Sequence, residues 1–70
     1  MNTGRIRWVS PDGSHGFILL PDGQEAYFNS FDLMSGESPY IEAGGEVSFE
    51  LLKTETGFEA FNIQTLVFSF

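Results

Sequence analysis

The feature that most constrains the fold is the tripeptide Pro-Asp-Gly, which occurs twice, at residues 11–13 and 21–23. Proline presets the backbone φ angle at the second position of a turn, and glycine accepts a positive φ at low cost. Apolar and aromatic runs flank both copies, which is typical of β-hairpins. The two turns therefore predict a meander of three strands, near residues 3–10, 15–20 and 25–29.

The second and third predicted strands have apolar side chains on both faces. Because side chains alternate along a strand, the aliphatic set and the ring-bearing set lie on opposite sides. A chain of 70 residues buries only one side well. We expect the core set to be Gly16, Ile18, Leu20, Ala26 and Phe28. We expect the outer set to include His15, Phe17, Leu19, Tyr27 and Asn29. Trp8 of the first strand is added to this set, because alternation is expected to place its ring off the core as well.

The second half of the chain predicts a short helical turn and a further hairpin. Ser30 precedes the apolar pair in Phe31-Asp-Leu33 as a helix N-cap would, and the rest of 34–45 is expected to be loop. Strands are predicted at 46–53 and 59–68, joined by a turn at 54–57. The inward side chains are expected to be Val47, Phe49, Leu51, Phe61, Ile63 and Val67, and the outward ones Glu46, Ser48, Glu50 and Phe58.

Five short strands without a helical layer cannot hide the edges of an open sheet. The predicted fold is therefore all-β, a small five-stranded antiparallel Greek-key barrel of the OB type, whose usual ligand surface lies on the second and third strands. We expect residues 1–70 to form a single domain, with an apolar C-terminal extension at 65–70.

Composition limits the classes of partner and chemistry. The formal charge of −7 speaks, taken alone, against nucleic acid and anionic membranes, although Arg5 and Arg7 both lie near Trp8. The lack of cysteine excludes disulfides and thiolate metal sites, and with one histidine no metal site or cofactor is expected. No leader peptide or stretch of about 20 apolar residues is evident, so a cytoplasmic protein that does not bind membranes is predicted.

Several motifs in this order resemble the bacterial cold-shock proteins, also called cold-shock domains. Residues 4–8 are similar to the family's Gly-x-Val-Lys-Trp, residues 14–18 to its Gly-Phe-Gly-Phe-Ile, and residues 26–29 to its Val-Phe-Val-His. The resemblance continues through Val-Ser-Phe at 47–49 and Ala-Phe-Asn-Ile at 60–63. It implies the barrel fold of that family.

The resemblance also implies binding of single-stranded RNA or DNA, with bases stacked on an aromatic face beside basic residues. At the matching positions rings are present in Trp8, Phe17 and Tyr27, whereas His15 and Asn29 replace the family's phenylalanine and histidine, so weak binding is expected. The predicted nucleic-acid-binding residues are Arg7, Trp8, His15, Phe17, Tyr27, Asn29 and Phe58.

Two other readings bear on function. The barrel could instead serve protein interaction or self-association, since Leu66, Phe68 and Phe70 alternate on a last strand that outlasts the barrel and could form a homodimer. Asp12, Ser14 and His15 are the residue types of a catalytic triad, but neighbours in one turn do not readily adopt triad geometry. We therefore expect no enzyme activity, and the choice between RNA and DNA stays open.

Overall fold

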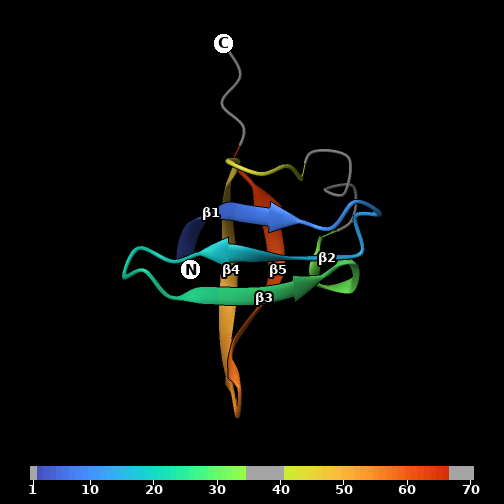
Figure 1. Cartoon of the computed structure of the whole chain (residues 1–70). Helices are drawn as coiled ribbons and strands as arrows, with labels where there is room; N and C mark the ends of the chain where they lie inside the picture. The colour runs from blue at the N-terminus through green and yellow to red at the C-terminus, as the bar shows by residue number, and fades with distance from the viewer. Residues whose placement is uncertain (1, 35–40, 67–70) are drawn as a thin grey trace.

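The chain folds into a closed barrel of five strands. The computed structural model describes residues 2–34 and 41–66, and Figure 1 shows the strands with one short 3₁₀ helix, η1. The barrel order is β1-β2-β3-β5-β4, which confirms the predicted small barrel. The elements are β1 (Asn2–Val9), β2 (His15–Leu19), β3 (Glu25–Asn29), η1 (Ser30–Asp32), β4 (Glu46–Thr54) and β5 (Gly57–Thr65).

One of the strand pairings in the barrel is parallel. β1–β2, β2–β3, β1–β4 and β4–β5 are antiparallel, whereas β3 and β5 run in the same direction. A long connection takes the chain from β3 across to β4, and β5 then returns along β4 to meet β3. Figure 1 shows the β4–β5 hairpin crossing behind the meander of β1, β2 and β3.

The core is drawn from all five strands. The inward residues of β2 and β3 are those that alternation predicted, and Gly16 faces inward among them. A Cβ at Gly16 would collide with the carbonyl oxygen of Trp8 and the ring of Phe28. A residue without a side chain therefore lets these groups approach the strand closely. The core consists of Ile6, Ile18, Leu20, Ala26, Phe28, Val47, Phe49, Ala60 and Ile63.

A bulge in β1 turns Trp8 outward. Ile6 pairs with Ile18, but Trp8 pairs with Phe17, so Arg7 is an extra residue on β1. Strict alternation would place Trp8 on the same side as the buried Ile6. The prediction that alternation by itself directs Trp8 outward was therefore wrong, although the outward position is correct. The extra residue reverses the alternation, and both Arg7 and Trp8 are exposed.

A second bulge, in β5, changes which phenylalanine faces the core. Ala60 and Ile63 are both fully buried, so the inward positions are three residues apart instead of two. Between them Asn62 has a φ of 52°, a left-handed conformation that asparagine tolerates better than most residues. The predictions for the neighbouring rings were therefore wrong. Phe58 is half-buried and packs against the core, whereas Phe61 is half-buried and does not join it.

The inward alternation of β4 is confirmed for Val47 and Phe49, with Leu51 half-buried against the core. Ser48 was predicted to face solvent, but only 3% of it is exposed. Its short side chain lies on a strand that is paired on both sides, with Thr3 on β1 and Gln64 on β5.

Two predictions, the inward position of Val67 and self-association through the apolar tail, concern the end of the chain, which the structure describes only in part. The last strand ends at Thr65, and Leu66 donates its backbone N–H to the oxygen of Glu46 at 2.9 Å. Val67 and the apolar positions Phe68 and Phe70 lie outside the described residues, so self-association through this segment stays a prediction.

In residues 2–34 and 41–66, no helix is long and apolar enough to cross a membrane.

Candidate functional site

Four rings form a connected cluster on the outer face of β1, β2 and β3. We call Trp8, His15, Phe17 and Tyr27 the aromatic platform. The ring centroids lie 5.4 Å apart for Trp8 and His15, 6.4 Å for Trp8 and Phe17, 6.3 Å for His15 and Tyr27, and 5.8 Å for Phe17 and Tyr27. Each ring therefore contacts two others, and the structure brings together four of the predicted site residues.

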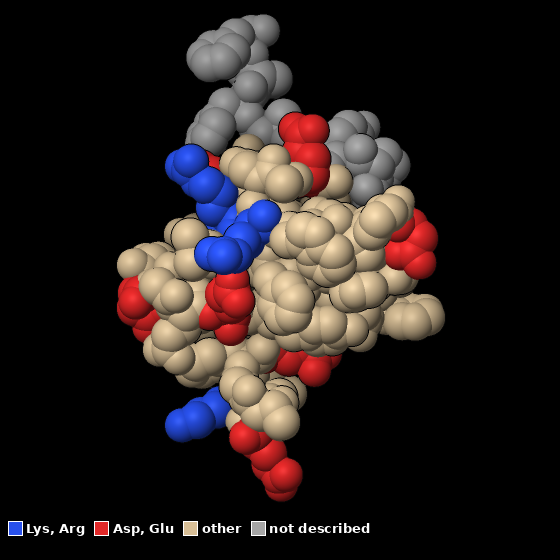
Figure 2. Space-filling model, viewed as in Figure 1, with Lys and Arg blue, Asp and Glu red and all other residues tan. Residues whose placement is uncertain are grey.

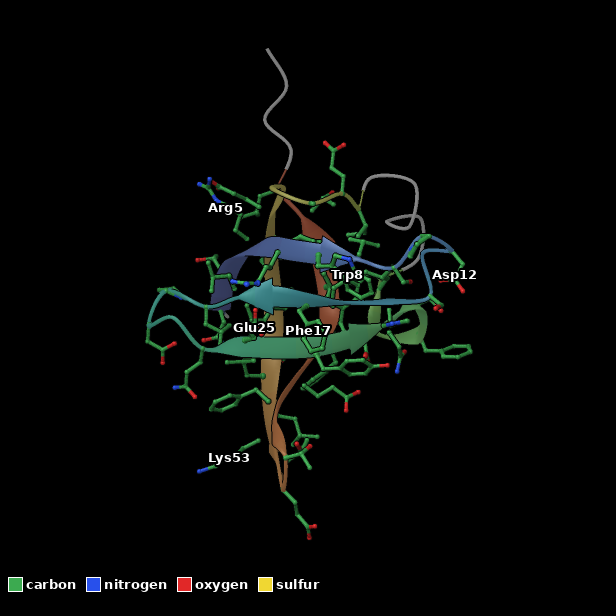
Figure 3. All side chains as sticks on the ribbon, in the orientation of Figure 1. Arg5, Trp8, Asp12, Phe17, Glu25 and Lys53 are labelled. Atoms are coloured by element: carbon green, nitrogen blue, oxygen red, sulfur yellow. The ribbon has the colours of Figure 1, made fainter. Side chains whose placement is uncertain are left out.

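The platform combines exposed rings with the support of three paired strands. Trp8 is 44% and Tyr27 is 38% exposed, while His15 and Phe17 are half-buried. Trp8, Phe17 and Tyr27 are direct neighbours across β1, β2 and β3. Trp8 and Phe17 lie in front of the strands in Figure 3. Since exposed rings next to one another offer flat apolar surfaces to a ligand, this face suits planar groups.

The turn between β1 and β2 holds His15 in place. The Ser14 hydroxyl donates to Asp12 Oδ1 at 2.8 Å and lies 2.9 Å from His15 Nδ1. With the hydroxyl proton directed at Asp12, Nδ1 of His15 is the donor to Ser14. The order is thus carboxylate, hydroxyl, imidazole. In a catalytic triad the imidazole lies between the other two groups, so this network does not have triad geometry.

Asp12 is the acceptor on which this turn is built. The Ser10 hydroxyl donates to its Oδ1 at 2.7 Å, and Ser14 adds its backbone N–H at 3.0 Å and its own hydroxyl. The hydrogen bond from Ser10 is the largest of the causes that lower the pKa of Asp12 from 3.8 to about 2, followed by those from Ser14. Asp12 is therefore a carboxylate at neutral pH.

Both arginines near the platform are in ion pairs. Arg7 Nε lies 2.7 Å from Glu25 Oε2, and Arg5 Nη2 lies 3.0 Å from Glu46 Oε1. Exposed pairs of this kind contribute about 0–1 kcal/mol, so a ligand anion could compete for either arginine. In the described part of the chain, Lys53 is the cation without an ion pair. Figure 2 shows a broad uncharged surface on this face, with acidic groups around its margin.

Asn29, a predicted ligand, is a helix cap. Its Oδ1 accepts the backbone N–H of Phe31 at 2.9 Å, and its own backbone N–H donates to Asp32 Oδ2 at 3.0 Å. This capping box begins η1, which confirms the predicted helical turn and corrects its cap from Ser30 to Asn29. The turn leaves Phe31 95% exposed, a ring that the sequence reasoning missed and that the spacing of Asn29 and Asp32 could have indicated.

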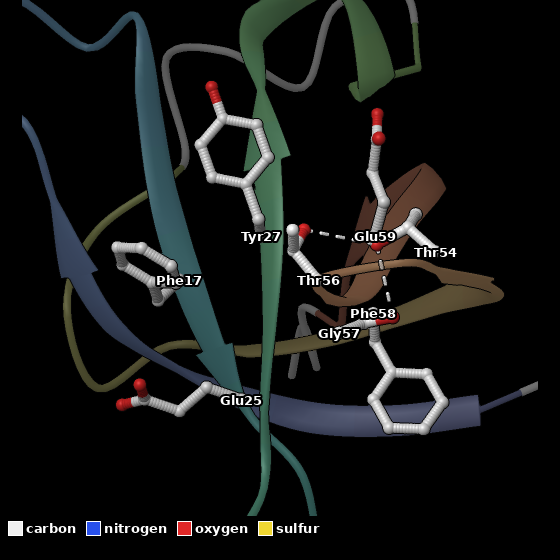
Figure 4. Close-up of a pocket in the computed structure, with 8 residues that line it drawn as sticks. All are labelled: Phe17, Glu25, Tyr27, Thr54, Thr56, Gly57, Phe58 and Glu59. Carbon is white, nitrogen blue, oxygen red and sulfur yellow. Dashed lines mark hydrogen bonds between the residues drawn. The ribbon is translucent and has the colours of Figure 1, made fainter.

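A groove adjoins the platform where β3 meets the β4–β5 hairpin (Figure 4). It has a volume of about 420 Å³. Phe17 and Tyr27 belong to both the platform and the groove, and Phe58, the last predicted site residue, lies in the groove and not in the ring cluster. Its lining consists of Phe17, Glu25, Tyr27, Thr54, Thr56, Gly57, Phe58 and Glu59.

Within residues 2–34 and 41–66, no group of three or more histidine, aspartate or glutamate side chains could hold a metal ion.

Comparison with known proteins gives a consistent set of relatives, although no family model matches the chain. Cold shock protein CspB of Bacillus caldolyticus is 31% identical over 67 residues, which cover 94% of this chain and 100% of the relative. Cold shock protein CspD of Bacillus subtilis (strain 168) is 30% identical with the same coverage. Cold shock-like protein CspD of Bacillus cereus is 29% identical over 63 residues, 90% of this chain and 96% of the relative.

Proposed function

The chain belongs to the cold-shock protein family, and from this premise we propose that it binds single-stranded nucleic acid by stacking bases on the aromatic platform. The observation that carries the proposal is the contact of Trp8, His15, Phe17 and Tyr27 in one exposed cluster. Stacking of a base on an aromatic side chain contributes about 1–3 kcal/mol and tolerates any sequence, because every base has a flat face. Both RNA and DNA meet this requirement.

Charge contributes little to this binding. The formal charge is −7, and Arg5 and Arg7 are already paired with glutamates. For a single strand, the logarithm of affinity falls by roughly 0.7 per phosphate neutralised for each tenfold rise in salt. With at most two or three cations near the strand, the salt dependence is shallow. Binding is weaker than in a barrel with a full set of rings and lysines.

The test is a titration that follows the fluorescence of Trp8, the chain's one tryptophan. A thymine heptamer and its uracil RNA counterpart should both change the emission. Phe17→Ala should weaken binding roughly tenfold, a mid-range value for one lost stacking contact. Met34→Ala removes an exposed apolar side chain outside the platform and is the matched control. Unchanged emission at millimolar nucleotide would contradict the proposal and favour the protein-interaction alternative.

The ion pair of Arg7 with Glu25 gives an independent test. Glu25→Gln should release Arg7 for a phosphate, so that binding tightens and the salt dependence steepens by roughly 0.7, the value for one further neutralised phosphate. Glu55→Gln, at the tip of the β4–β5 hairpin, removes the same charge without releasing an arginine. Equal effects of the two variants would show that only the net charge matters and that Arg7 contacts no phosphate.

A further inference from the structure

The row of rings across the barrel ends on a carboxylate. Trp8 on β1 pairs with Phe17 on β2, and Phe17 pairs with Tyr27 on β3. The parallel pairing of β3 with β5 then places Tyr27 directly beside Glu59. Glu59 precedes the fully buried Ala60, so alternation directs its side chain to the outer face that the rings share.

The Glu59 carboxylate lies in the groove and is available to a ligand. Figure 4 draws both Glu59 and Tyr27 among the residues that line the groove. The groove also contains Glu25, but one oxygen of Glu25 is held by Arg7 at 2.7 Å. Among residues 2–34 and 41–66, no ion pair or hydrogen bond engages the side chain of Glu59. A bound strand that follows the rings therefore reaches a half-buried, unpaired acceptor.

Carboxylate chemistry decides which part of a nucleotide fits there. An ionised carboxylate only accepts hydrogen bonds, and it repels phosphate. Thymine and uracil offer one N–H between two carbonyl oxygens, and adenine and cytosine offer an amino group next to a ring acceptor. Guanine alone presents two adjacent donors, N1–H and the N2 amino group, which match the two oxygens of a carboxylate. Such two-point hydrogen bonding is the stronger and more specific kind.

We propose that the groove selects guanine, with the base stacked on Tyr27 and its N1–H and N2 amino group donating to Glu59. The proposal rests on the function proposed above and adds a base preference to it. Phe17 and Phe58 form the apolar walls, and Thr54 and Thr56 lie along the hairpin side of the groove. The phosphates stay on the solvent side, away from both glutamates.

The experiment compares three DNA heptamers, all thymine, thymine with one central guanine, and thymine with one central hypoxanthine, which keeps N1–H and lacks the N2 amino group. For a partly exposed groove, two-point recognition of the base by one side chain should give about five- to tenfold tighter binding of the guanine heptamer. The hypoxanthine heptamer should lie between the other two. The single substitution avoids the folded structures that guanine-rich strands form.

Glu59→Gln should bring the guanine and thymine heptamers to equal affinity while the thymine heptamer still binds. Glu55→Gln, in the same hairpin but outside the groove, should keep the preference. The melting temperature of each variant shows that the barrel is intact.

A guanine preference that survives Glu59→Gln, or no preference in the wild-type chain, would overturn the proposal. Failure of every heptamer to bind would instead refute the underlying nucleic-acid function. Binding of an oligolysine peptide that is lost in Glu59→Gln, without any guanine preference, would assign the groove to a basic protein partner and likewise overturn it.

Discussion

The two Pro-Asp-Gly turns contain the same tripeptide and the same backbone hydrogen bond. Gly13 N–H donates to Ser10 O at 2.9 Å, and Gly23 N–H donates to Leu20 O at 2.9 Å. Both glycines have positive φ angles, 74° and 92°. The tripeptide therefore determines the course of the chain through each turn. It does not determine what holds the turn to the rest of the molecule.

The flanking residues make that difference. Ser10 and Leu20 occupy equivalent positions before their turns and are 6% and 7% exposed. Leu20 joins the hydrophobic core, whereas the Ser10 hydroxyl donates to Asp12 and accepts the backbone N–H groups of Ser14 and His15 at 3.0 and 3.2 Å. One turn is held by packing and the other by a polar network that also orients a platform ring. A turn next to a binding surface gains from directional bonds, because they fix a side chain and not only a chain reversal.

The largest expected effect comes from breaking the packed turn. Leu20→Ala leaves a cavity at the end of the core, and truncations of this type cost about 2–5 kcal/mol. The free energy of unfolding, measured by urea denaturation, should fall by an amount near the lower end of that range because Leu20 lies at the rim of the barrel. A smaller loss of unfolding free energy than for Ser10→Ala would contradict the view that packing holds this turn and hydrogen bonds hold the other.

The next effect comes from breaking the polar turn. Ser10→Ala removes the acceptor of two backbone N–H groups and one donor to Asp12. The Ser14 N–H keeps its bond to Asp12, so the His15 N–H is the group that loses its acceptor. Leaving a partly buried polar group unpaired costs about 1–3 kcal/mol, and we expect a loss of about 1–2 kcal/mol in the same urea experiment. Stability equal to that of the wild-type chain would show that water replaces the hydroxyl without cost.

The dependence of stability on pH sharpens the comparison. The pKa of Asp12 is about 2 in the folded chain, below the ordinary 3.8, so its stabilising contribution is complete above 3.8 and disappears as pH falls through 2. The melting temperature of Asp12→Asn should therefore lie below that of the wild-type chain at pH 6 and converge with it near pH 2. A difference in melting temperature that is constant with pH would contradict this origin.

Asp22 supplies the matched control for that experiment. The backbone N–H and the side-chain amide of Gln24 lower its pKa, and no serine hydroxyl contributes. Asp22→Asn should shift the melting temperature in the same direction and by less than Asp12→Asn.

The smallest effect concerns binding. Ser14→Ala removes the hydroxyl that fixes His15, so the imidazole gains rotational freedom that a bound base must remove. We expect the affinity for a thymine heptamer to fall about two- to threefold, which corresponds to about half a kcal/mol. Gln24→Ala, at the second turn, should leave the affinity unchanged. Equal affinities of the Ser14→Ala and Gln24→Ala variants would show that His15 does not contact the bound base.

The sequence predicts the parts of this molecule that depend on local patterns. Alternation around Pro21-Asp-Gly23 gave the register of β2 and β3, the buried face and the outward rings, because turn chemistry and the period of a strand are local properties. Spacing between motifs, together with the family resemblance, indicated the barrel. The four platform rings were all among the predicted binding residues.

The bulges could not be read from the sequence. An extra residue at Arg7 turns Trp8 outward, and one near Asn62 exchanges the expected roles of Phe58 and Phe61. Nothing local distinguishes these positions, because bulges meet the demand of closing a strongly bent sheet. Glu59 was overlooked because its place beside Tyr27 depends on the pairing of β5 with β3, which is not a local property of the sequence.

The short parallel ladder between β3 and β5 has a consequence for how the barrel opens. Its residue pairs are Ala26 with Phe58 and Tyr27 with Glu59, whereas the β4–β5 ladder continues along most of both strands. Segments with few backbone hydrogen bonds open at the lowest free energy, so amide hydrogens along this line exchange with solvent before those of the meander. In the proposed complex, a base held between Tyr27 and Glu59 would contact both strands there. The ligand would then link β3 and β5 where few backbone hydrogen bonds do so, and closure of the barrel would become part of the binding equilibrium.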